Sequence, residues 1–249
     1  MKFMFGKKNI NVTAYTFERG VYINDAPTYN KADNPEWIRT LKNSYKQFDV
    51  NTKSSYDVGT AKLCPGIRNY LQEGIHFKCW TSIKLRIHPS GFVENLPQSI
   101  THPYEPFVQH SPQQFENIYP DNKTAFKLNN PWIVKCTDRK VKFLFAESHY
   151  STTFFRENDL TIAPGLIDFY YQNTANVHIV APKKEVPYEL IIPYGTPLFT
   201  LYPLSERQIN FNTELVSSDE FNAIKDIFPN CPMKRYFQLI RNLGEDSLP

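Results

Sequence analysis

The feature that most constrains this chain is a series of short apolar runs between residues 154 and 202, separated by Asn, Pro and Gly. Each run is rich in β-branched or aromatic residues, and turn-forming residues recur at the intervals found in β-barrels and β-sandwiches. The runs are Phe154-Phe155, Leu160–Ile162, Gly165–Asp168, Val177–Val180, Glu189–Ile192 and Pro197–Tyr202. They predict a meander of short strands that forms the body of the protein.

Three earlier regions also alternate apolar and polar residues with the period of a strand. Residues 74–87 and 131–146 each predict two strands, the second pair around a turn at Thr137–Lys140. The segment Ile10–Ile23 predicts a hairpin with its turn at Glu18–Gly20. These regions extend the β-rich body toward the N-terminus.

Helix signals lie near both ends of the chain. Asn34 and Pro35 are typical of an N-cap followed by proline at the first helical position, and apolar residues at helical spacing predict a helix over about 35–47. Ser217–Glu220 has the capping-box pattern of a second helix that Pro229 ends, and Pro232 opens a third. We therefore expect a body at 1–207 with a helix near 35–47, and a C-terminal helical pair at 208–249 packed on it. The predicted class is β-rich α+β, with a distorted β-barrel or sandwich.

The charge balance argues against a nucleic-acid binder. The 249 residues contain 28 Lys and Arg against 25 Asp and Glu, a net charge of +3, and these charges are dispersed along the chain. No apolar run is long enough to cross a membrane, and the four cysteines are widely spaced without a disulfide pattern. These observations predict a soluble, intracellular protein with free thiols.

A proline-rich stretch from His88 to Pro131 is long and irregular, as site-bearing loops or interface arms are. It contains His88, His102 and His110, which could converge on a metal ion with Glu94, Glu105 or Glu116. Their spacing matches no recognised metal motif. The alternative is that this stretch is an interface segment without a metal.

Asp168 is the candidate ligand-binding residue, and Tyr170 or Tyr171 could stack on a base beside it. The carboxylate could bind a sugar hydroxyl or position a water molecule. The alternative is that Asp168 organises a turn through bonds between its side chain and the backbone. Gly165 and Gly195 are expected to serve tight turns, and Trp132 is expected to be structural.

Several short motifs follow one another in an order that resembles a family of uncharacterised proteins encoded mainly by tailed bacteriophages. The motifs are Cys64–Gly66, His110–Gln113, Lys127-Leu128, Pro131–Lys135, Gly165–Asp168 and Gly195–Leu204. This resemblance covers roughly residues 35–207 and implies a phage origin, without implying an activity. It places the protein in the host cytoplasm, with the virion as a second location.

A more local resemblance is to the barrel fold of dUTPases and dCTP deaminases. Gly165–Tyr171 looks like the hairpin that holds the deoxyribose and base in that fold, and Ile192–Leu198 looks like the strand that closes its barrel. The phosphate-binding loop, the arginine-bearing glycine-rich tail and the acidic magnesium ligands of those enzymes have no counterpart here. The resemblance therefore implies a barrel more than dUTP hydrolysis.

Two functional hypotheses follow from the sequence. The first is a phage-encoded, non-catalytic β-rich protein that acts by assembly or binding to proteins or to itself, because no nucleophile, phosphate-loop or metal motif is found and no cofactor is implied. The second is a nucleotide-binding or nucleotide-processing protein that uses the Asp168 hairpin.

Overall fold

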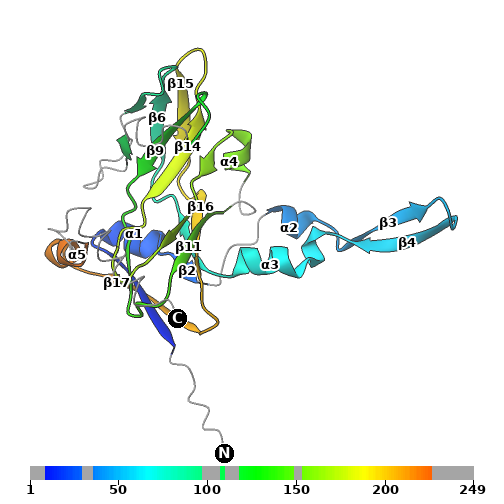
Figure 1. The fold of residues 1–249 in the computed structure, drawn as a ribbon, viewed down its shortest axis with the longest axis horizontal. Helices are drawn as coiled ribbons and strands as arrows, with labels where there is room; N and C mark the ends of the chain where they lie inside the picture. The colour runs from blue at the N-terminus through cyan, green and yellow to red at the C-terminus, as the bar shows by residue number, and fades with distance from the viewer. Residues whose placement is uncertain (1–8, 30–35, 97–106, 110–117, 149–152, 226–249) are drawn as a thin grey trace, which may run out of the picture.

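The protein is described by a computed structural model that covers residues 9–29, 36–96, 107–109, 118–148 and 153–225. The chain is predominantly β-structure, as the alternating sequence predicts, with short helices between the strands (Figure 1). The strands are β1 (Ile10–Thr16), β2 (Thr28–Tyr29), β3 (Ser44–Asp49), β4 (Ser54–Gly59), β5 (Ile75–Lys78), β6 (Ile83–Ile87), β7 (Val93–Asn95), β8 (Phe107–Gln109), β9 (Lys123–Leu128), β10 (Ile133–Cys136), β11 (Phe143–Glu147), β12 (Thr161–Ile162), β13 (Gly165–Ile167), β14 (Val177–Pro182), β15 (Tyr188–Ile192), β16 (Pro197–Pro203) and β17 (Ile209–Leu215). The helices are α1 (Arg19–Asn24), α2 (Glu36–Thr40), η1 (Ala61–Leu63), α3 (Pro65–Gln72), α4 (Phe154–Glu157) and α5 (Ser218–Lys225).

The strands form several open sheets. Their orders are β13-β11-β16-β5-β2, β12-β14-β9-β8, β10-β1-β17, β15-β6-β7 and the separate hairpin β3-β4. Among the described strands no sheet closes on itself, so the expected barrel is wrong, although the β-rich class is confirmed. A barrel requires the two edge strands of one sheet to pair with each other. In the described chain the two edge strands of each sheet of three or more strands do not pair in this way.

The expected hairpin over residues 10–23 is also wrong. Strand β1 ends at Thr16, and the residues that follow form helix α1, in which Val21 is buried. β1 instead pairs antiparallel with β10 and parallel with β17, from opposite parts of the chain. The alternating pattern identifies the strand but carries no information about which strand pairs with it.

The predicted helix over about 35–47 is shorter than expected. Helix α2 ends at Thr40, and the residues from Ser44 to Asp49 form β3. Tyr45, whose spacing from Trp37 and Leu41 suggested a helix, is exposed in this strand. Pairing along the full length of β4 supplies hydrogen bonds to the β3 amides and carbonyls that face it, where no core surface is available to stabilise a helix.

The C-terminal region departs from the expected helical pair as well. Residues 209–215 form β17, which pairs with β1 of the body. The body therefore extends beyond residue 207, where the C-terminal helical region was expected to begin. Helix α5 follows, and the Ser217 hydroxyl accepts the Glu220 N–H at 3.2 Å. The predicted third helix lies outside the described residues.

The core is centred on three stacked phenylalanine rings of the five-stranded sheet. The ring centroid of Phe199 on β16 lies 4.5 Å from Phe77 on β5 and 4.4 Å from Phe145 on β11, with interplanar angles of 8° and 22°. Phe199 is directly opposite Phe77 in the strand register. Adjacent strands therefore place aromatic rings on the same buried face, where cross-strand pairs stabilise a sheet.

Helix α3 packs against the opposite face of this sheet and joins it to the β3-β4 hairpin. Tyr70 on the helix stacks on Tyr202 of β16 at 5.2 Å, and the two hydroxyls donate to the carbonyl oxygens of Glu147 and Tyr70, each at 2.5 Å. Beyond α2 and α3 the hairpin projects away from the body (Figure 1). No described helix is long and apolar enough to span a membrane.

Candidate functional site

Asp168 lies at the end of β13 and organises the turn that follows. Its Oδ1 accepts the backbone N–H of Tyr170 at 3.0 Å, while its carbonyl oxygen accepts the N–H groups of Tyr171 and Gln172 at 3.1 and 2.9 Å. Burial raises the pKa of the Asp168 carboxyl, an effect opposed by the Tyr170 N–H and by the charge of Lys142. This geometry matches the turn-organising alternative, and ligand binding by Asp168 stays a prediction.

The two tyrosines beside Asp168 contact each other. The ring centroids of Tyr170 and Tyr171 are 4.9 Å apart with an interplanar angle of 76°, an edge-to-face arrangement. The rings are thus not parallel, and a flat base could stack on only one of them. Tyr170 is exposed, whereas Tyr171 is half-buried. Stacking of a base at this turn stays a prediction.

The three expected structural residues have different surroundings. Gly195 has a φ of +77°, in the left-handed region that favours glycine, within the turn before β16. Gly165 lies outside that region, and a Cβ added there would meet nothing within 4 Å. Trp132 is almost completely buried and lies 6.4 Å from the ring of Tyr22 on α1.

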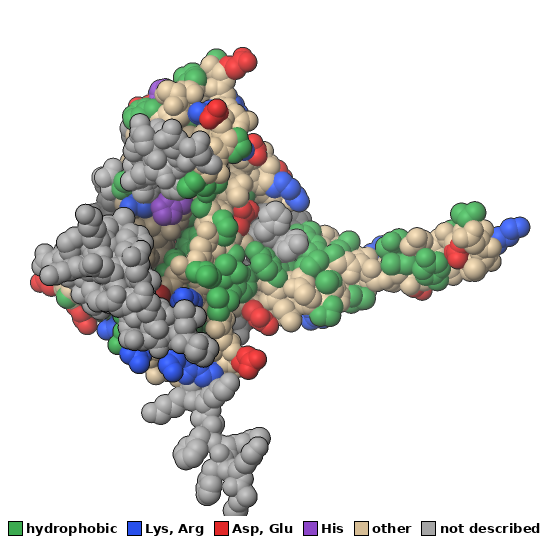
Figure 2. Space-filling model, in the orientation of Figure 1, with side chains coloured by type: hydrophobic (Ala, Val, Ile, Leu, Met, Phe, Trp, Pro, Cys, Tyr) green, Lys and Arg blue, Asp and Glu red, His purple; other side chains and the backbone are tan. Residues whose placement is uncertain are grey.

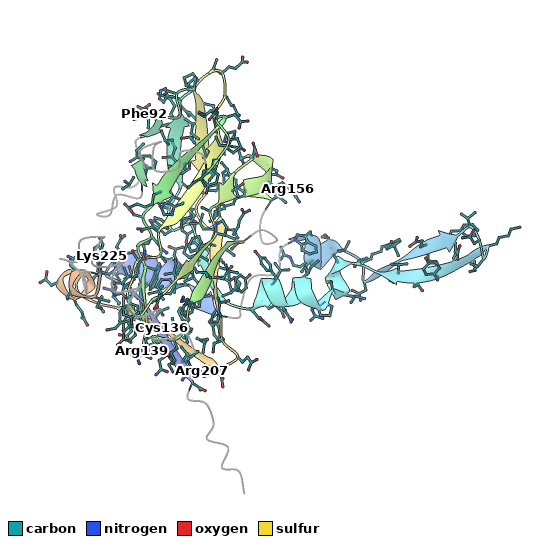
Figure 3. The ribbon with its side chains drawn as sticks, in the orientation of Figure 1. Phe92, Cys136, Arg139, Arg156, Arg207 and Lys225 are labelled. Carbon is teal, nitrogen blue, oxygen red and sulfur yellow. The ribbon has the colours of Figure 1, made fainter. Side chains whose placement is uncertain are left out.

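Of the histidines expected to bind metal, only His88 belongs to the described part of the chain, and His102 and His110 lie outside it. His88 Nε2 is 3.4 Å from Glu94 Oε2, and the same carboxylate is 3.5 Å from Arg86. His88 also contacts Phe92, which lies at the end of the body far from Cys136 and Arg207 (Figure 3). The described residues contain no group of three or more His, Cys, Asp or Glu arranged to hold a metal ion.

A polar cluster inside the sheet resembles the pairing of a serine or threonine nucleophile with a histidine general base. His76 Nδ1 is 3.0 Å from the Thr200 hydroxyl, which is 3.2 Å from the Ser148 hydroxyl. All three side chains are buried, and burial lowers the pKa of His76, an effect opposed by the Gln72 backbone. These contacts give the two hydroxyls and His76 Nδ1 hydrogen-bond partners inside the protein, whereas His76 Nε2 is buried without a partner among the described residues.

The most distinctive surface is the β3-β4 hairpin, residues 44–59, which we call the arm. The substantial packing contacts of β3 and β4 within the described chain are with each other. Tyr45 faces Val58 and Gln47 faces Tyr56 across the strands, so the apolar members of these pairs share one face. Tyr45 and Tyr56 are 52% and 49% exposed.

The other face of the arm and its tip are also apolar in part. Phe48 is 59% exposed on the second face, and Val50 at the tip is 77% exposed. Figure 2 shows hydrophobic side chains along the arm and over the adjoining part of the body. An isolated two-stranded hairpin that leaves this much apolar surface in water is marginally stable.

The tip of the arm is nevertheless well ordered by local hydrogen bonds. Asp49 Oδ1 accepts the Asn51 N–H and Oδ2 accepts the Thr52 hydroxyl, each at 2.9 Å. The Asn51 N–H, and after it the Thr52 hydroxyl, lower the pKa of Asp49. Lys53 completes the turn with a φ of +48°. These bonds hold Val50 outward at the end of the arm.

The base of the arm is closed by hydrogen bonds between its two ends. Thr60 donates its N–H to the Asn43 carbonyl at 2.9 Å and its hydroxyl to the Lys42 carbonyl at 2.6 Å. Lys62 Nζ donates to the Leu41 carbonyl at 3.1 Å. The arm therefore projects from a fixed base.

A groove of about 320 Å³ lies at this base, between α2, η1 and α3. Ile38, Leu63 and Leu71 provide its apolar lining, and Lys62 and Arg68 add positive charge. Leu63 is exposed, so the groove offers an apolar surface to solvent. The volume lies at the small end of the range for ligand pockets and would accept one or two side chains.

The arm was missed by the sequence analysis, although a signal for it exists. Ser44–Asp49 and Ser54–Gly59 are polar runs with alternating aromatic or aliphatic residues, and an Asp-Val-Asn-Thr-Lys turn joins them. Asp and Asn in such a position favour a turn. The helical spacing of the residues before Tyr45 outweighed this signal.

A scan against protein-family models and searches of curated proteins and of solved structures found no match to this chain. The function must therefore be inferred from the geometry of the chain itself.

Proposed function

We propose that this chain is a non-catalytic β-rich protein that acts by assembly or binding, and that the arm is the element that docks onto another protein surface. The observation that carries this proposal is the projection of the arm from the body with Tyr45, Phe48, Val50 and Tyr56 exposed. The arm is held at its base, so its contact residues are presented away from the sheets.

The residue types on the arm support protein binding. Aromatic side chains are enriched at the centres of protein interfaces, where tyrosine supplies a large apolar area and a hydroxyl at little conformational cost. Covering the arm would also supply the packing that a two-stranded hairpin lacks on its own. Removal of this surface from water is thus favourable both for binding and for the order of the arm.

The setting that we propose is a bacteriophage, with the virion as one destination of the protein. This part of the proposal rests on the resemblance of the motifs between residues 35 and 207 to a tailed-phage family. Mass spectrometry of purified virions tests it directly, since a virion component is recovered from particles after stringent washing. Recovery only from the soluble fraction of infected cells would remove the virion from the proposal.

The arm itself can be tested by excision, because its two ends are hydrogen-bonded to each other. Replacing residues 44–59 by two glycines leaves Asn43 and Thr60 close enough to join, as a two-residue hairpin turn does. We expect the tagged wild-type chain to sediment with a larger complex in the cells that naturally express it, and the excised chain to sediment alone.

The matched control is Val186→Lys, which changes an exposed aliphatic residue in the loop before β15. This variant should sediment like the wild type, because its substitution lies on the body. Equal sedimentation of the wild-type and excised chains would contradict the proposed function.

A further inference from the structure

We propose that the surface that covers the arm is a second copy of this chain, and that two arms exchange about a two-fold axis so that the tip of each enters the groove at the base of the other. This inference rests on the proposed function and names its partner. The arm, its tip and the groove are all present on every copy, so no other protein is needed.

The geometry of the arm makes the exchange self-consistent. The tip residue Val50 and the groove lie at opposite ends of the same hairpin. When two identical arms lie antiparallel around an axis through their middles, the tip of each meets the base of the other, whatever the length of the arm. Such a contact is isologous and closes as a dimer, the commonest form of self-association.

The surfaces that meet in this arrangement are chemically matched. Val50 is an exposed aliphatic side chain, and Ile38, Leu63 and Leu71 provide an apolar lining large enough to receive it. Asp49 beside the tip would face the positive charges of Lys62 and Arg68 that flank this lining. Along the arms, Tyr45 of one copy, which is nearer the base, would pack on Tyr56 of the other, which is nearer the tip.

The arm has no net charge, which favours a partner surface that is also neutral. Lys46 and Lys53 are offset by Asp49 and Asp57, so the arm is neutral, and Lys46 lies directly opposite Asp57 across the strands. Two neutral arms approach without net repulsion, while a polyanion such as nucleic acid gains no phosphate neutralisation from them. The arm is thus better suited to its own copy than to a strongly charged partner.

A single cysteine substitution tests the exchange, because an exposed thiol is already present beside the groove. Among the cysteines of the described residues, Cys64 follows Leu63 and is exposed, while Cys79 and Cys136 are buried. In Val50→Cys, mild oxidation should produce a reducible dimer in which the introduced thiol of one copy is linked to Cys64 of the other. Mixing ¹⁴N-labelled and ¹⁵N-labelled chains and sequencing the linked peptides shows that the bond joins two copies.

Two variants serve as controls. Val50→Cys combined with Cys64→Ser should lose the dimer, and Val186→Cys, at an exposed position on the body, should not link to Cys64. Arg68→Glu should raise the dissociation constant measured by sedimentation equilibrium at least about tenfold, since it would place an acid opposite Asp49. Far-UV circular dichroism checks that each chain remains folded.

The outcomes separate this inference from the proposed function. A link between positions 50 and 64 that depends on Cys64 and is absent from the body control supports the arm exchange. Absence of that link, or an equal yield from Val186→Cys, overturns the exchange. If the excised chain still loses its complex in cells while no such link forms, the partner of the arm is a different protein and the proposed function stands.

Discussion

Phe199 and Phe77 face each other across β16 and β5 with their rings stacked at 4.5 Å and an interplanar angle of 8°. Phe145 stacks on Phe199 at 4.4 Å, so Phe199 is in contact with two aromatic rings. We expect Phe199→Ala to lower the free energy of unfolding by about 3–5 kcal/mol, because it leaves a cavity between those rings. Urea denaturation measures this change.

The control for that substitution is Phe48→Ala on the arm. Phe48 is exposed and has no place in the core, so the free energy of unfolding of the body should change by less than about 0.5 kcal/mol. A comparable loss in both variants would mean that the aromatic stack does not stabilise the sheet as described.

Gly74 joins α3 to β5 at a point where no side chain fits. Its φ is +93°, and an added Cβ would lie 2.7 Å from Thr200 Cγ2 and 2.9 Å from the Leu201 carbonyl oxygen. We expect Gly74→Ala to destabilise the protein by at least about 2 kcal/mol, through backbone strain and the clash together.

Gly195 provides a matched comparison, because its φ is also positive, at +77°, while an added Cβ meets nothing within 4 Å. Gly195→Ala should cost about 1 kcal/mol from backbone strain alone. Thermal unfolding of both variants distinguishes the two contributions. If Gly195→Ala were the more damaging change, the close contact at Gly74 would not be the source of its sensitivity.

Most local strand patterns were readable from the sequence, although Phe154-Phe155, expected in a strand, lies in helix α4. The pairing of the strands was not readable. The apolar alternation of Ile75 with Phe77, and the apolar runs around Phe143 and Phe199, identify strands, although β5 and β16 bury residues on both faces. The parallel pairing of β1 with β17 joins residues about two hundred positions apart and depends on the completed fold. Whether a sheet closes also depends on the completed fold. The spacing of short strands therefore predicted a barrel, although the sheets of the described chain are open.

The candidate sites show a similar division. The alternative of Asp168 as a turn residue could be stated from the sequence because Asp–backbone bonds are local. The arm was missed because Trp37, Ile38, Leu41 and Tyr45 fall at helical spacing, and this pattern outweighed the turn signal of Asp49 and Asn51. The groove requires three elements to meet and has no sequence pattern of its own.

Asp138 should stabilise the protein at neutral pH and lose this effect in acid. The Lys140 N–H, and after it the Arg207 guanidinium, lower the pKa of Asp138 below its ordinary value of 3.8. A lowered pKa gives stability that is present above the unfolded-state pKa and is lost as the pH falls through the folded-state value. Asp138→Asn should cost roughly 0.5–1 kcal/mol at pH 7, and the difference from wild type should shrink below about pH 4.

Asp168→Asn should show the opposite trend with pH. Burial raises the pKa of Asp168, so its contribution is most favourable below the ordinary value of 3.8 and is lost as the pH rises through the folded-state pKa. The asparagine keeps an acceptor for the Tyr170 N–H and removes the half-buried charge. We expect the variant to be as stable as wild type or slightly more stable at pH 7, and this gain to disappear in acid. Urea denaturation between pH 3 and pH 7 measures both aspartate variants.

A ligand role for Asp168 is tested by the same variant together with Asp168→Ala. If Asp168 serves the turn, Asp168→Ala should cost about 1 kcal/mol through loss of the bond to Tyr170, and no deoxynucleotide should raise the melting temperature of the wild type. A nucleotide that stabilises the wild type but not Asp168→Asn would support the nucleotide-binding hypothesis instead. The control for general effects on stability is Asp138→Asn, which should retain any nucleotide response.

Amide exchange should show that the backbone amides of the arm become more protected when two copies meet. The backbone bonds between β3 and β4 are the main interactions of either strand within the described chain, so the free hairpin should exchange its amides much faster than β11 and β16. Arm exchange between two copies would bury both hairpins, and protection of residues 44–59 should therefore rise with protein concentration while protection of β16 stays constant. In Val50→Lys the concentration dependence should move to higher concentration, because a charged tip cannot enter the apolar groove without desolvation. Protection of the arm that is high in dilute protein and independent of concentration would contradict this account, since it would mean that the hairpin is stable without a partner.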